Sequence, residues 1–105
     1  MNDKPLWDTR RAASLDGALV LVGITLESPE GSRLSQFYGT VVEVDAANGV
    51  TLRLEETRSG ETYRLPPDLN AFTPAPPGEY RLRGTGEAVR DPDFTTRWTI
   101  TRPAN

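Results

Sequence analysis

Apolar and polar residues alternate through residues 37–65 with the period of two that is typical of β-strands. The pattern predicts three short strands joined by two tight turns. A three-residue loop, Ala47-Asn48-Gly49, joins the first two strands with their apolar side chains on one face, whereas a two-residue Asn48-Gly49 loop would mix the faces. Gly49 then occupies the left-handed position that closes a loop of this length.

This register predicts which side chains share the core. The second turn, residues 57–60, returns the chain to a third strand that ends at Pro66-Pro67, because proline has no N–H to donate to a sheet. Side chains that face each other across the strands should project together into the interior. The predicted pairs are Val44 with Leu52, Val42 with Leu54, Leu54 with Tyr63, and Leu52 with Leu65.

A short helix is predicted just after Trp7. Asp8 or Thr9 would be its N-cap, and Asp16-Gly17 would end it. Trp7 and Leu15 would pack against one end of the strands. The helix therefore serves as a cover for the core.

The run Ala18–Leu26 is apolar almost throughout, which favours a strand covered on both faces. Gly23, inside this run, marks either a bulge or a close approach of another backbone. Residues 27–35 are polar and rich in turn formers, and a loop is predicted for them. The next strand is expected to begin at Gln36.

Five of the nine prolines fall within residues 65–78, a segment in which Leu69 and Phe72 are expected to anchor a 3₁₀ turn. Residues 79–83 alternate and predict a strand with Tyr80 and Leu82 facing inward. Residues 94–101 alternate in the same way. Their inward face is predicted to carry Phe94, Thr96, Trp98 and Ile100.

About six short strands separated by turn signals predict an all-β protein. The length, the bent central strands and the short N-terminal helix favour an SH3-like or Sm-like barrel of five to six strands, with an OB-like barrel as the alternative. A chain of 105 residues is expected to form a single domain, residues 1–105. Residues 1–5 and 103–105 are expected to be flexible ends.

The chain has no histidine and no cysteine. This excludes Ser-His-Asp and Cys-His nucleophile systems, ordinary zinc sites and disulfides. Asp91-Pro92-Asp93 lacks the spacing of an EF-hand loop and favours a turn. We therefore expect neither catalytic activity nor a cofactor or metal.

The net charge is −3, which disfavours a nucleic-acid partner. No stretch approaches the ~20 apolar residues of a membrane helix. The N-terminal residues lack the pattern of a secretory signal. The expected location is the cytoplasm.

The stretch from Gly39 to Leu52 resembles the first motif of the Sm family: a strand, an aspartate, a turn asparagine and a second strand. In that family the aspartate and the asparagine belong to a loop that binds RNA bases, and they match Asp45 and Asn48. The resemblance implies single-stranded RNA binding as the alternative function. Asn48 also has a simpler explanation, because asparagine is favoured in tight turns.

The whole chain resembles a group of small uncharacterised bacterial proteins. The resemblance implies a distinct domain of unknown function and supplies no activity. It rests on Leu6-Trp7-Asp8, Leu21-Val22-Gly23-Ile24-Thr25, Leu65-Pro66-Pro67-Asp68-Leu69, residues 76–82, and Asp91-Pro92-Asp93-Phe94 with Trp98.

The proline-rich segment and the aromatic residues near it predict a surface for a protein partner. Pro74-Ala75-Pro76-Pro77 satisfies PxxP, but its position between two strands favours a stiffened loop. Edge strands also allow a homo-oligomer. We therefore expect a protein-interaction module whose surface comprises Pro66, Pro67, Asp68, Phe72, Pro76, Pro77, Tyr80 and Trp98.

Overall fold

The computed structural model describes residues 7–55 and 60–101. Strands dominate them, as the alternating pattern predicts. In chain order the elements are α1 (Thr9–Leu15), β1 (Leu19–Ser28), β2 (Gly31–Asp45), β3 (Gly49–Leu54), β4 (Thr62–Leu65), the 3₁₀ helix η2 (Leu69–Ala71), β5 (Phe72–Pro74), β6 (Glu79–Arg81), β7 (Ala88–Arg90) and β8 (Phe94–Thr101).

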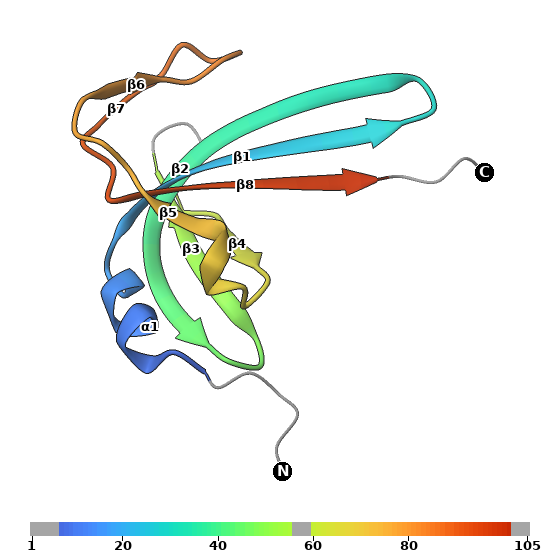
Figure 1. Ribbon diagram of the computed structural model, residues 1–105. Coiled ribbons are helices and arrows are strands. Elements are labelled where there is room, and N and C mark those ends of the chain that lie inside the picture. The colour runs from blue at the N-terminus through green and yellow to red at the C-terminus, as the bar shows by residue number, and fades with distance from the viewer. Residues whose placement is uncertain (1–6, 56–59, 102–105) are drawn as a thin grey trace.

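Six strands form one sheet in the order β4-β3-β2-β1-β8-β5, and β6 pairs with β7 in a separate two-stranded sheet (Figure 1). The β1–β8 pair is parallel, and the other pairs are antiparallel. The all-β prediction is therefore confirmed. The barrel prediction is wrong, because β4 and β5 are the two edges of the sheet and do not pair with each other.

The sheet bends along β2, whose first part pairs with β1 and whose last part pairs with β3 (Figure 1). Gly39 lies where the two pairings overlap, opposite both Val20 and Leu54. A Cβ atom at Gly39 would lie 2.5 Å from the backbone oxygen of Arg53, closer than real Cβ contacts. Glycine is thus required for the strands to approach at the bend.

The predicted register of β2 and β3 is wrong, because β2 contains a β-bulge at Val42. The pairing shifts between Val41 and Glu43, so that Val41 faces Leu52. The side chain of Val42, predicted to be buried, is 44% exposed. The extra residue of a bulge turns the following side chains to the opposite face, which alternation alone does not reveal.

The first turn has the predicted length but begins one residue earlier. The pair Asp45–Gly49 closes it around residues 46–48, and Val44 pairs with Val50. Gly49 has the expected left-handed conformation, with φ of 98°.

The predicted register of β3 and β4 is two residues off: Leu52 pairs with Tyr63, and Val50 with Leu65. A shift of two keeps every side chain on its predicted face. The predicted turn includes residues 57–59, which lie outside the described residues.

The main core lies in the concave side of the bent sheet, where α1 and η2 close it. Helix α1 begins as predicted, with the side chain of Asp8 accepting a hydrogen bond from the backbone N–H of Arg11 at 3.0 Å. Its Leu15 is fully buried, and Trp7 packs against the core. The buried residues of this core are Ala12, Leu15, Val20, Val22, Ile24, Phe37, Val41, Val50, Leu52, Leu54, Leu65, Leu69 and Phe72.

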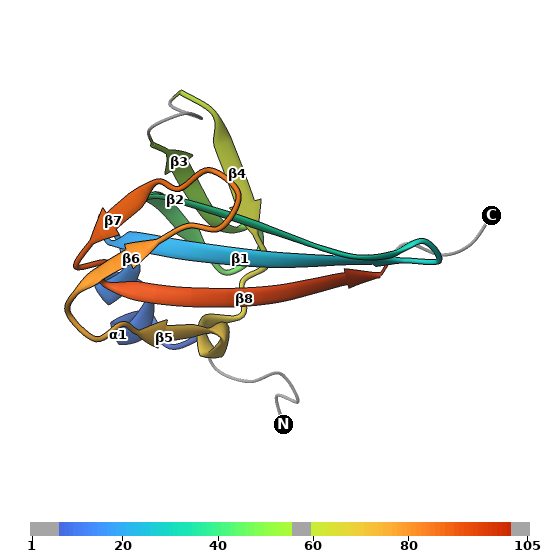
Figure 2. The ribbon, with the colours of Figure 1, turned by 90° about the horizontal axis from the view of Figure 1, so that it is seen from above.

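A second, smaller core lies on the other face of the sheet, beneath the β6–β7 hairpin (Figure 2). Leu82 and Val89 of this segment pack with Tyr38 over Leu19 and Leu21. The first half of β1 is therefore covered on both faces, as predicted.

The prediction of a loop over residues 27–35 is wrong. Strands β1 and β2 continue through them as a hairpin that turns at Pro29-Glu30, with Ser28 paired to Gly31. Together with the end of β8 they form a three-stranded extension that projects from the body (Figures 1 and 2). We call it the arm and define it as residues 23–28, 31–36 and 97–101.

Candidate functional site

Each outer strand of the arm, β2 and β8, is paired with β1 on its inner side and presents its other edge. On one side, β2 pairs with β3 only from Gly39 onward, so in the part of the chain that the structure describes residues 31–36 have β1 as their one strand neighbour. On the other side, β5 pairs with β8 only over residues 94–96. Among the described residues, the segment 97–101 of β8 therefore has a strand neighbour on one side alone. Such an edge presents backbone N–H and C=O groups to a further strand.

The inner face of the arm continues the apolar face of the core outward. In the register of β1 and β8, Ile24 lies beside Trp98, and Leu26 beside Ile100. Ile24 is buried, Trp98 and Leu26 are half-buried, and Ile100 is 46% exposed. The apolar strip thus becomes progressively more exposed toward the tip, along the free segment of β8.

The outer face of the arm is hollowed. Two cross-strand rows form its floor: Gln36, Gly23 and Arg97 in one, and Leu34, Thr25 and Thr99 in the other. The hollow has a volume of about 490 Å³. We call it the outer hollow; its lining residues are Gly23, Thr25, Leu34, Gln36, Arg83, Arg97, Trp98 and Thr99.

Gly23 leaves the floor of the outer hollow open. The pairing of β1 is continuous through Gly23, so the predicted bulge is wrong. A close backbone approach is also absent there, because the nearest atom to an added Cβ is the Cδ1 atom of Leu34, at 3.9 Å. The missing side chain instead creates space between Gln36 and Arg97, its neighbours on either side.

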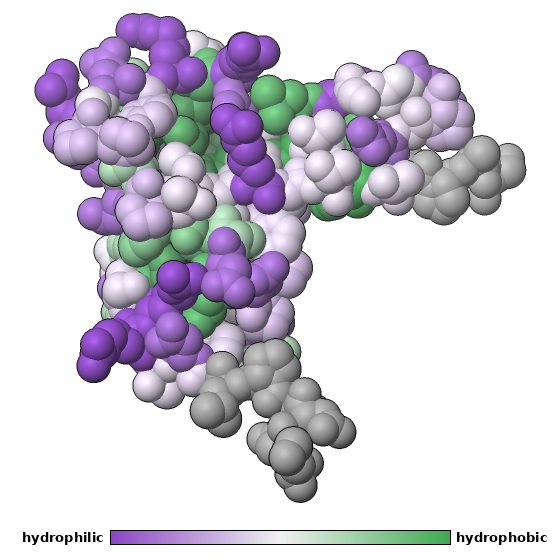
Figure 3. Space-filling model, viewed as in Figure 1, coloured by the Kyte–Doolittle hydropathy of each residue, from purple (hydrophilic) through white to green (hydrophobic). Residues whose placement is uncertain are grey.

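Arg83 joins the hollow from the segment that links β6 to β7. Its backbone N–H donates to the Oε1 atom of Gln36 at 2.7 Å, which fastens this segment to the arm. Hydrophobic residues are exposed on the arm beside the hydrophilic side chains of the hairpin in Figure 3. The outer hollow is therefore a polar site next to an apolar surface.

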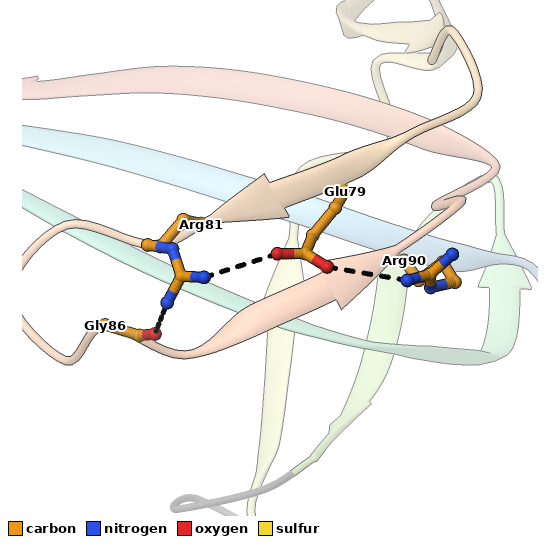
Figure 4. Close-up of polar contacts among 4 residues, drawn as sticks. All are labelled: Glu79, Arg81, Gly86 and Arg90. Carbon is orange, nitrogen blue, oxygen red and sulfur yellow. Dashed lines mark hydrogen bonds and ion pairs between the residues drawn. The ribbon is translucent and has the colours of Figure 1, made fainter.

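The arginines of this region differ in their partners. Glu79 forms ion pairs with both Arg81 and Arg90: one carboxylate oxygen lies 3.3 Å from Nη2 of Arg81, and the other lies 3.6 Å from Nη2 of Arg90 (Figure 4). Arg81 also donates from Nη1 to the carbonyl oxygen of Gly86 at 3.2 Å. In contrast, no carboxylate of the described residues forms an ion pair with Arg83 or Arg97.

The surface predicted from the proline-rich segment is divided between the two cores. Phe72 is buried in the main core, where its ring meets Trp98 edge-on at a centroid distance of 6.5 Å. Tyr80 belongs to the smaller core, and its hydroxyl donates to the carbonyl oxygen of Pro76 at 2.6 Å. Phe72 is thus a core residue, whereas Trp98 lies in the arm.

The remaining residues of that surface have local structural roles or lie exposed. Asp68 is the N-cap of η2 and accepts from the backbone N–H of Asn70 at 3.2 Å, as the predicted 3₁₀ turn requires. The prolines are exposed; they are Pro66, Pro67, Pro76 and Pro77. Their part in binding stays a prediction.

Asp45, the last residue of β2, and Asn48, in the turn that follows, bond to each other. The Oδ2 atom of Asp45 accepts from Nδ2 of Asn48 at 2.6 Å, and its Oδ1 atom accepts from the backbone N–H of Ala47 at 3.1 Å. Both side chains therefore stabilise the turn.

Of the residues that line the outer hollow, sequence reasoning singled out Trp98 alone; those it missed include Gly23 as an opening, Arg83 and Arg97. The alternation of residues 94–101 placed Arg97 on the polar face, which was the available signal. No periodicity reveals that β8 lies beside β1, and this pairing is what brings Arg97 next to Gly23.

Within residues 7–55 and 60–101, no cluster of three or more acidic side chains is arranged to hold a metal ion. No helix in the same residues has the length and apolar character that crossing a membrane requires. No family model matches the sequence, and neither a curated protein nor a solved structure shows significant similarity to it.

Proposed function

We propose that the protein is an interaction module that binds an extended segment of a partner protein along the free edge of β8. The supporting observation is the arm, in which residues 97–101 combine an edge that has no strand neighbour among the described residues with the exposed end of an apolar strip. A partner strand added there gains backbone hydrogen bonds and side-chain contacts with Trp98 and Ile100.

The edge of β8 is better suited to this role than the edge of β2. Residues 97–101 are threonine, isoleucine, tryptophan and one arginine, which favour pairing in a sheet. Residues 31–36 are mostly glycine, serine and other polar residues, with Leu34 as the apolar exception. Each cross-strand pair with an aromatic or branched side chain contributes roughly 0.2–1 kcal/mol.

We assign the chain no catalytic activity, because it has no histidine or cysteine to act as base or nucleophile. RNA binding has less support than protein binding. The two residues that the Sm resemblance selects, Asp45 and Asn48, bond to each other, and Asp45 also accepts from the backbone of the turn.

Peptides selected from a displayed random library against the full chain test this proposal. We expect binders whose affinity falls at least about tenfold in Ile100→Lys, because a lysine on an edge strand opposes strand addition. Val42→Lys is the matched control: Val42 is 44% exposed and Ile100 46%, but Val42 lies outside the arm. Binders that are equally weakened by both variants, or by Val42→Lys alone, would contradict the proposal.

A further inference from the structure

We propose, on the basis of the function proposed above, that the outer hollow receives a carboxylate side chain of the partner strand between Arg97 and Arg83. The partner would then be an extended segment in which acidic and apolar residues alternate.

The position of the hollow supports this inference. Arg97 and Thr99 line the hollow and also belong to the free edge of β8. A strand added at this edge places every second side chain on the outer face, directly beside these two residues, at Cβ separations of about 4.5–5.5 Å. Its intervening side chains fall on the inner face beside Trp98 and Ile100.

The charges in the hollow select the acidic side chain. Arg83 and Arg97 have no carboxylate partner among the described residues, whereas Glu79 serves both Arg81 and Arg90. A guanidinium binds a carboxylate through paired, charge-assisted hydrogen bonds. The hydroxyls of Thr25 and Thr99 supply further donors at the floor.

The space in the hollow matches a side chain. Gly23 leaves room between Gln36 and Arg97, and Gln36 fixes the segment that carries Arg83 through its 2.7 Å hydrogen bond. A carboxylate entering from the β8 edge therefore meets Arg97 first and has Arg83 as the second cation lining the same hollow.

A second copy of this chain fits the site less well than a different protein. Two β8 edges paired antiparallel over residues 97–101 would place Thr99 opposite Thr99 and Arg97 opposite Thr101. That arrangement brings no carboxylate to either arginine. Charge complementarity thus favours a partner with acidic residues at alternate positions.

Two synthetic peptides of equal length test the inference with the full chain. One alternates valine with glutamate, and the other alternates valine with glutamine. We expect both to shift the amide NMR signals of residues 97–101, and the glutamate peptide to bind about tenfold more tightly. Arg97→Gln and Arg83→Gln should each reduce that preference about fivefold. Arg53→Gln, an exposed arginine on β3, is the matched control and should leave it unchanged.

A further variant tests the hollow itself. Gly23→Val fills the floor and should abolish the preference for glutamate while the glutamine peptide still binds. Equal affinities of the two peptides for the native chain, or a preference that survives both arginine variants, would overturn the carboxylate site and leave strand addition intact. Failure of both peptides to move the signals of residues 97–101 would overturn strand addition as well. Self-association that Ile100→Lys abolishes would identify a second copy as the occupant and overturn the inference.

Discussion

Two threonines of the sheet have buried hydroxyl groups that differ in their hydrogen bonding. The side chain of Thr96 is almost fully buried, and its Oγ1 donates to the carbonyl oxygen of Ala71 at 2.8 Å. The Oγ1 atom of Thr51 is also buried but has no hydrogen-bond partner within residues 7–55 and 60–101. A buried hydroxyl without a partner lowers stability, because its bonds to water are lost and not replaced.

The same substitution should therefore have opposite effects at the two positions. Thr51→Val removes the unpaired hydroxyl and should raise the free energy of unfolding by about 1 kcal/mol. Thr96→Val leaves the carbonyl of Ala71 unpaired and should lower it by about 1–3 kcal/mol. Urea unfolding of both variants measures the difference, and a change of the same sign in both would contradict this explanation.

Residues whose role depends on local chemistry were the most predictable from sequence. Asp8 caps α1 through a neighbouring N–H, and Gly49 takes the left-handed conformation that its turn needs. Val42 was not predictable, because the bulge that exposes it follows from the bend of the sheet and not from its own neighbours in sequence.

At the scale of the strand, two glycines have different reasons for being glycine. Gly39 lies at the bend of β2, where a Cβ would meet the backbone oxygen of Arg53 at 2.5 Å. Gly23 lies in the straight part of β1, where a Cβ would make one ordinary contact at 3.9 Å. The first glycine permits the fold, and the second opens a surface.

Alanine substitutions distinguish these two roles. Gly39→Ala should lower the melting temperature strongly, with a loss of about 1–3 kcal/mol or more, because backbone atoms must move to admit the methyl group. Gly23→Ala should change stability by less than about 1 kcal/mol in either direction. Thermal unfolding followed by circular dichroism measures both, and a tolerant Gly39→Ala would refute the steric requirement at the bend.

Strands were easier to predict than their partners. The alternation of residues 94–101 identified β8 and its inward face, yet nothing in a period of two indicates that β8 runs parallel to β1. The arm was missed for a related reason: serines, glycine and glutamate in residues 27–35 resemble a loop, and only continuous pairing with β1 makes them a strand. Trp98 was singled out from the sequence as a site residue. Arg83 was not, because only the fold brings the segment that carries it to the arm.

At the scale of the molecule, β8 completes both the core and the arm. It lies between β1 and β5, it carries buried Thr96 and half-buried Phe94, and its Trp98 packs on Phe72. The residue just before β8 is held to the start of β1 by a backbone hydrogen bond: the N–H of Asp93 donates to the carbonyl oxygen of Leu19 at 2.8 Å.

A chain that stops at residue 91 should therefore lose cooperative unfolding. Without β8, β1 loses its strand neighbour on one side, and β5 has no strand to pair with. A chain that stops at Thr101 is the control and should unfold in a single transition. Denaturant titration followed by tryptophan fluorescence, with Trp7 present in both chains, compares them; a sharp transition in the shorter chain would contradict the role given to β8.

The parallel partnership of β1 and β8 also constrains how the protein is made. Leu19 and Asp93 are 74 residues apart, so a ribosome needs about 4–15 s after β1 emerges before its neighbour has been synthesised. In that interval Val20, Val22 and Ile24 have β2 beside them but not β8. The nascent chain thus exposes the apolar side chains of β1 for seconds. Closing so large a loop makes the final folding step, the pairing of β8 with β1, slow.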